Sequence, residues 1–112
     1  MPAPGPRELL EDPSRFGYRD ARWKNPGPGT QARAEVAAGF HIHQAVLALR
    51  RTLAEQGVAQ TELAERIGVK PDYLRRKMRG ESWASIQDLK AWALELGIDL
   101  LPVYDSREDL LP

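Results

Sequence analysis

The chain has 112 residues, which is enough for one small domain with extended ends. It contains no cysteine, and this excludes disulfides, thiolate metal sites and a cysteine nucleophile. The absence of cysteine favours an intracellular, cytoplasmic protein. No apolar run approaches the roughly 20 residues of a membrane span, so no membrane contact is expected, and the 16 basic and 16 acidic residues cancel.

Residues 1–30 are rich in proline and glycine. Proline lacks the amide donor, and glycine loses the most backbone entropy when it is fixed, so regular structure is unfavourable here. We therefore predict a disordered N-terminal arm. Basic and aromatic residues alternate within it: Arg15, Phe16, Tyr18, Arg19, Arg22, Trp23 and Lys24.

The segment from Arg33 to Gln56 has the periodicity of a helix, and Gly57 suits a left-handed C-terminal cap. Gly39 weakens the first part, which leaves open whether the segment is two helices or one with a frayed start. The apolar residues that share one face are Ile42, Val46, Leu49 and Leu53.

Two short helices are predicted next, Gln60 to Ile67 and Pro71 to Arg79, separated at Gly68 and ended by Gly80. Their inward residues are Leu63, Ala64, Ile67, Leu74 and Met78. Two short helices joined by a three- or four-residue turn with glycine are typical of a helix-turn-helix. The small side chain of Ala64 suits the close crossing, and Gly68 suits a turn with positive φ.

Ser85, followed three residues later by Asp88, predicts a capping box for a further helix that ends at Leu96 and is closed by Gly97. We expect Trp92 at its flank and an inner face made of Ile86, Leu89, Ala93 and Leu96. The predicted fold is all-α: a compact four- to five-helix bundle over residues 31–98, with an extension and acidic tail over 99–112.

The zero net charge hides two opposite patches. Between Arg66 and Gly80 there are six basic residues and one acid, a net charge of +5, whereas residues 81–112 hold seven acids and two bases, a net charge of −5. A local basic patch is what a nucleic-acid-binding surface requires, although charge alone favours the simpler interpretation of a solvated helix face.

The sequence from Gln60 to Val69, with Tyr73 to Gly80 and Ser85 to Gly97, resembles the lambda-repressor-like family, also called the Cro/repressor or XRE family. The resemblance covers about residues 43–98. It implies a small transcriptional regulator, expected to be a repressor, that binds double-stranded DNA as a homodimer in the cytoplasm or nucleoid and needs no cofactor. The arm is a further candidate DNA contact, although a plain linker is an equally good interpretation.

The resemblance also implies roles for individual residues. Gln60 and Thr61 would meet phosphates, and so would Arg79. Arg75 and Arg76 would read guanine, for which arginine is the best bidentate donor. The remaining candidate DNA-binding residues are Lys70, Asp72 and Tyr73; Asp72 alternatively favours the helix N-terminus, and Tyr73 alternatively covers the helix junction.

Two positions depart from the family pattern. Ala59 stands where serine or threonine usually caps the first motif helix, and Lys77 stands where many members have an apolar residue. Met78, one residue later, is expected to make the core contact that the apolar residue makes in those members.

No other chemistry is supported by the sequence. His41 and His43 are two residues apart and point to different sides of a helix, whereas chelation favours a spacing of four, so no metal site is predicted. No catalytic constellation is found, so no enzymatic activity is expected. Trp83 and Trp92 are interpreted as packing residues.

Two questions stay open in the sequence. An alternative function is an antitoxin-like interaction module whose tail, Asp105 to Pro112, binds a protein partner. The dimer face also has two candidates, the helix near Val36 and Phe40 or the segment from Leu100 to Tyr104.

Overall fold

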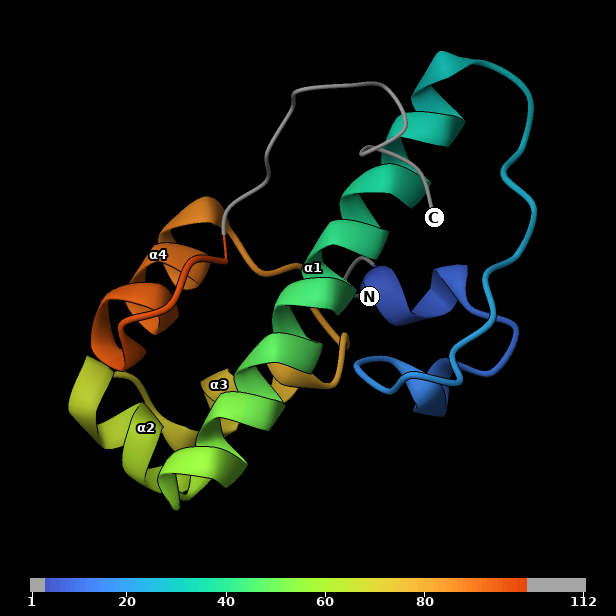
Figure 1. Cartoon of the computed structure of the whole chain (residues 1–112). Coiled ribbons are helices and arrows are strands. Elements are labelled where there is room, and N and C mark those ends of the chain that lie inside the picture. Colours follow the sequence, from blue (N-terminus) through green and yellow to red (C-terminus); the bar gives the residue numbers. More distant parts are fainter. Residues whose placement is uncertain (1–3, 101–112) are drawn as a thin grey trace.

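A computed structural model describes residues 4–100 of the chain. In this part, four α-helices form the bundle, and two short 3-10 helices precede them (Figure 1). The predicted all-α fold is confirmed. The elements are η1 (Pro6–Leu9), η2 (Pro13–Arg15), α1 (Thr30–Gln56), α2 (Gln60–Ile67), α3 (Pro71–Met78) and α4 (Ile86–Leu96). None of these helices is long and apolar enough to cross a membrane.

Helix α1 is one continuous helix, which settles the alternative raised by Gly39. Gly57 ends it in the left-handed conformation, with φ 66°, as predicted. Gly39 is buried in the helix interior, where a Cβ atom would lie 2.6 Å from Leu9 Cδ1. The glycine therefore allows the N-terminal segment to approach the helix closely, and it does not break the helix.

The prediction of a disordered arm is wrong for residues 4–24. Leu10 is fully buried and Phe16 is 1% exposed, and both belong to the same core as α1 to α4. Figure 1 shows this segment beside α1, across that helix from α4. Burial of two large apolar side chains outweighs the cost of ordering a chain rich in proline and glycine.

One backbone hydrogen bond ties this segment to the loop after α3, because the Arg7 amide donates to the Gly80 carbonyl at 3.1 Å. Another closes the segment on itself, from the Lys24 amide to the Leu9 carbonyl at 3.0 Å. Close backbone contacts add to them, since a Cβ on Gly5 would lie 2.2 Å from the Gly80 carbonyl oxygen. The segment is therefore docked on the loop between α3 and α4 as well as on α1.

Helix α4 begins with the predicted capping box of Ser85 and Asp88 and ends at Gly97 in the left-handed conformation. Its buried face differs from the prediction. Trp92 is 1% exposed and lies in the core, whereas Ile86 is 66% exposed. The helix is rotated so that Leu89, Trp92 and Leu96 face inward, because the large Trp92 ring buries more apolar area than Ile86.

The acidic tail and the rest of the segment that follows Leu100 lie outside the described residues. Leu100 itself is buried, at 5% exposure.

Candidate nucleic-acid interface

Helices α2 and α3 form a compact pair around small and apolar side chains. Leu63 and Ala64 of α2 are fully buried, and Leu74 and Met78 of α3 are 1% exposed. Gly68, with φ 79°, ends α2 in the left-handed conformation and donates its amide to carbonyls of the last α2 turn. The turn that follows leads directly into Pro71, the first residue of α3. This geometry fixes α3 on the core by one face and leaves its other face outside.

The outward face of α3 carries the two predicted base readers. Arg75 and Arg76 follow the buried Leu74, and a helix turns about 100° per residue, so both point away from the core. Their side chains are 54% and 60% exposed. The side chain of Arg79, at the C-terminal cap of α3, is 59% exposed and lies 3.9 Å from Glu81.

Asp72 pairs with both of these arginines. Its carboxylate accepts a hydrogen bond from Arg76 Nε at 2.9 Å and another from Arg75 Nη2. The hydrogen bond from Arg76 is the main cause that lowers the pKa of Asp72, and Arg75 adds to it. Asp72 lies in the first turn of α3, where a carboxylate also favours the helix dipole. Asp72 therefore stays charged and orients the two arginines in the free protein.

The predicted contact residues line two shallow hollows that share Asp72. The first lies between α2 and α3 and includes Gln60, Thr61, Arg75 and Arg79. The second includes Lys70, Tyr73 and Arg76, with Lys77 and Ser82. Five of the eight predicted residues therefore line the first hollow. The other three line the second hollow, together with Asp72, which belongs to both.

Tyr73 and Lys77 both reach α4. The Tyr73 hydroxyl donates to Asp88 Oδ1 at 2.8 Å, and this bond raises the pKa of the phenol. Lys77 Nζ donates to the Trp83 carbonyl at 2.7 Å and lies 5.0 Å from the centre of the Tyr73 ring. Tyr73 thus covers the junction between α3 and α4 and remains 42% exposed.

These contacts explain how the fold accepts a lysine at position 77, where many members of the family have an apolar residue. Its side chain is only 15% exposed, and its ammonium lies 3.8 Å from Asp88 Oδ2. The aliphatic stem thus fills space at the junction of α3 and α4 while the charge is neutralised at its end. Met78 is buried beside it, as predicted. Ala59 is the other residue that departs from the family pattern. It is the N-cap of α2 and provides no side-chain hydrogen bond.

Two residues that the sequence did not assign to this face also line the first hollow: Arg50 of α1 and Tyr18 of the N-terminal segment. Arg50 is near the end of α1 and gave no periodic signal, while Tyr18 was expected in a disordered arm. Three arginines and one aspartate line this hollow, which gives it a net charge of +2. The basic character predicted for α3 therefore extends onto α1.

The two histidines have separate structural partners. His43 is buried and its Nδ1 accepts a hydrogen bond from the Gly17 amide at 2.8 Å. Burial lowers its pKa. Its ring packs against Phe16 and Trp23, with centroids 5.6 and 5.5 Å away. His41 Nε2 instead lies 3.2 Å from the Leu100 carbonyl.

One of the two candidate dimer faces is occupied within the chain. Val36 is buried, and the Phe40 ring packs edge-on against Trp23, with centroids 5.6 Å apart. The N-terminal segment covers this part of α1, because it folds where the sequence predicted disorder. Part of this candidate dimer face is therefore already in contact with the N-terminal segment, while Phe40 remains half-buried.

Comparison with known proteins agrees with the geometry. A family model described as helix-turn-helix matches residues 47–103, just over half of the chain, from the last part of α1 through α4. Comparisons with curated proteins and with solved structures gave no match. The N-terminal segment lies outside the matched region. With the buried α2–α3 pair, the glycine turn and the exposed outer face of α3, this match shows that the chain belongs to the lambda-repressor-like, or XRE, family of helix-turn-helix DNA-binding regulators.

Proposed function

We propose that this protein is a sequence-specific repressor that binds double-stranded DNA through α3. The observation that carries the proposal is the outward face of α3, where Arg75 and Arg76 are exposed and oriented by Asp72. An α-helix fits the major groove of B-form DNA, and arginine donates two hydrogen bonds to the O6 and N7 atoms of guanine. Arg75 and Arg76 are the base-reading residues in this proposal.

The remaining candidates position the helix. Gln60 and Thr61 open α2, where free backbone amides and side chains suit phosphate oxygens. Arg79, at the C-terminal cap of α3, shares a hollow with them, which supports a phosphate contact close to theirs. Lys70, at the N-cap of α3, supplies charge at the opposite end. Phosphate contacts of this kind fix the register but carry no sequence information.

The homodimer belongs to the proposal too. Two-fold dimers of helix-turn-helix proteins place their reading helices one DNA turn apart, so we expect a near-palindromic site with half-sites separated by about 34–36 Å. Repression then requires only that the dimer occupies the site.

Selection from a random duplex pool tests the proposal. Purified protein should enrich one motif with inverted half-sites at low salt, and sedimentation of the complex should give two protomers per selected duplex. Recovery of a motif without symmetry and a complex with one protomer would remove the dimer. Failure to retain any duplex at low salt would remove the DNA-binding function itself.

A further inference from the structure

The folded N-terminal segment reaches the proposed DNA surface at Tyr18. Tyr18 is 40% exposed and lines the same hollow as Thr61 and Arg79. Gly17 makes this position possible, because its φ of 81° turns the chain and a Cβ there would lie 2.7 Å from Val46 Cγ1 and 3.2 Å from Arg50 Nε. The Gly17 amide is held by His43 of α1. The position of Tyr18 is thus fixed by the core.

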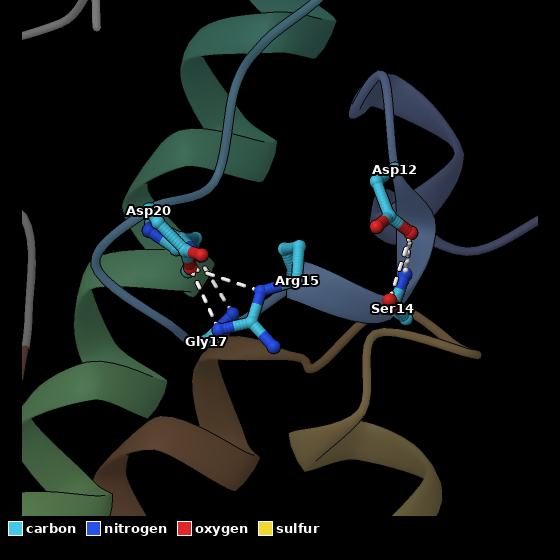
Figure 2. A network of polar contacts seen from close by, with 6 residues as sticks. Asp12, Ser14, Arg15, Gly17 and Asp20 are labelled. Atoms are coloured by element: carbon cyan, nitrogen blue, oxygen red, sulfur yellow. Dashed lines mark hydrogen bonds and ion pairs between the residues drawn. The ribbon is translucent and has the colours of Figure 1, made fainter.

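Two guanidinium groups lie over the Tyr18 ring. The central carbon of Arg15 is 4.5 Å from the ring centroid, and that of Arg50 is 4.8 Å away. Stacking on an aromatic ring restricts a guanidinium to one orientation. Figure 2 shows that Arg15 is turned toward Asp20, which accepts from Arg15 Nε at 2.9 Å and from Nη2 at 2.8 Å. Arg15 is therefore already neutralised.

Arg50 differs from Arg15 in having no acid of its own. Within residues 4–100 it forms no ion pair, and its Nε is buried without a hydrogen-bond acceptor. Every other arginine of the first hollow has a carboxylate close by, Asp72 for Arg75 and Glu81 for Arg79. Since Arg50 lines this hollow and no carboxylate of the described residues offsets its charge, an anionic oxygen delivered to the terminal nitrogens of its guanidinium forms a charge-assisted hydrogen bond.

We infer that Arg50, oriented by Tyr18, binds a phosphate of the DNA backbone beside the segment that α3 reads. The inference rests on the proposed function and gives the N-terminal segment a role in it. The guanidinium donates to two phosphate oxygens, and the stacked Tyr18 ring holds it in the plane that this requires. The site is a phosphate clamp made by two elements outside α2 and α3.

The test compares Arg50→Gln with Arg33→Gln. Both remove one positive charge from α1, but Arg33 lies 17 residues earlier, about 25 Å along the helix, and is exposed. Arg50→Gln should weaken binding to the selected duplex and to random duplex by similar factors, about tenfold as for one charge-assisted hydrogen bond. The slope of log affinity against log salt should become shallower by about 0.9 for each lost contact. Arg33→Gln should change neither quantity.

A second readout places the phosphate and guards against a folding defect. Duplexes that carry one uncharged methylphosphonate each should reveal a position where the parent loses affinity and Arg50→Gln loses none further. Tyr18→Ala should lose duplex affinity as Arg50→Gln does, whereas Tyr18→Phe, which keeps the ring, should bind like the parent. The melting temperature of every variant should lie above the assay temperature, so that a loss of affinity is not a loss of folding.

The outcomes separate this inference from the proposed function. If the parent binds the selected duplex and Arg50→Gln binds it equally well, the phosphate clamp is wrong and the role of α3 stands. If Arg50 binds inorganic phosphate in a titration while duplex affinity is unchanged in Arg50→Gln, the site takes a free anion and the assignment to DNA is wrong. If the parent binds no duplex, both proposals fail.

Discussion

Arg75 and Arg76 both lie on the outward face of α3, and each lines a hollow of its own. Replacing either with alanine should cost about 1–3 kcal/mol in binding to the selected duplex, as expected for a bidentate contact to guanine, and much less on random duplex. Stability should change by less than about 0.5 kcal/mol, because both side chains are exposed. Paired titrations beside melting curves give all three quantities.

Arg79→Ala and Leu74→Ala are the controls for this prediction. Arg79→Ala should weaken both bindings by similar factors, because a phosphate contact carries no sequence information. Leu74→Ala should destabilise the fold by about 2–5 kcal/mol through a core cavity. Equal losses on the two duplexes for Arg75→Ala and Arg76→Ala would show that these residues only attract phosphate.

Asp72 sits between the two arginines and repels the DNA backbone. Asp72→Asn removes this charge and frees both guanidinium groups, so binding to random duplex should strengthen several-fold at low salt while the preference for the selected duplex falls. Glu95→Gln, on an exposed position of α4, removes the same charge away from the site and should change little. Weaker random binding by Asp72→Asn would mean that its role is structural.

His43 makes stability depend on pH. Its pKa is lowered by burial, and its Nδ1 must be unprotonated to accept from Gly17. The unfolded chain takes up the proton as pH falls below about 6.5, whereas the folded chain resists it. Stability is therefore full above that pH and is lost as pH falls through the window below it, at about 1.4 kcal/mol per pH unit until the folded pKa is reached.

Denaturant titrations at pH 8 and pH 5.5 measure this dependence. His43→Gln keeps an acceptor but does not titrate, so its loss of stability between the two values should be smaller than that of the parent. Identical pH profiles for the parent and His43→Gln would contradict the role given to the buried ring.

At the scale of elements, the N-terminal segment is a structural part of the domain. Leu10 and Phe16 are buried in the core, so Leu10→Ala should destabilise the fold by about 2–5 kcal/mol and Phe16→Ala by about 3–5 kcal/mol. Leu94, 84% exposed on α4, is the matched control, and Leu94→Ala should change stability by less than about 0.5 kcal/mol. Unchanged melting curves for the two core variants would restore the interpretation of a loose arm.

The helices were predictable because their signals are local. Gly57, Gly68 and Gly97 end α1, α2 and α4 in the left-handed conformation, and the Ser85–Asp88 capping box starts α4. The docking of the N-terminal segment was not predictable in this way. It depends on contacts between residues far apart in sequence, such as Gly5 with Gly80 and Gly17 with His43, and the local composition pointed to disorder.

The same distinction holds for the site. Arg75 and Arg76 were predicted to face outward from the spacing of Leu74 and Met78, and they do. Arg50 reaches that face only through the tertiary fold, so neither spacing nor charge on a single element indicated it. Tyr18 was named only as part of an arm that could contact DNA, and its position beside α3 also depends on the tertiary fold. Trp92 was misplaced for a related reason, because one apolar stripe on α4 is compatible with two rotations that differ by about one residue.

Considering the described residues together, basic side chains gather on α3 and on the end of α1 beside it, where Arg50, Arg75 and Arg79 line one hollow. A concentration of positive charge of this kind attracts an anionic duplex before any base is contacted. The exposed apolar residue Leu94 lies in the last part of α4, six residues after Asp88, the α4 residue that contacts Tyr73. DNA binding should therefore perturb one side of the domain.

Amide chemical shifts recorded while the selected duplex is added to the full chain identify the helix that meets the DNA. We expect the largest changes on Gln60, Thr61 and the residues of α3, and little change at amides near Leu94 on α4. Changes concentrated on α4, with α3 unaffected at saturating duplex, would contradict the claim that α3 is the helix that reads DNA.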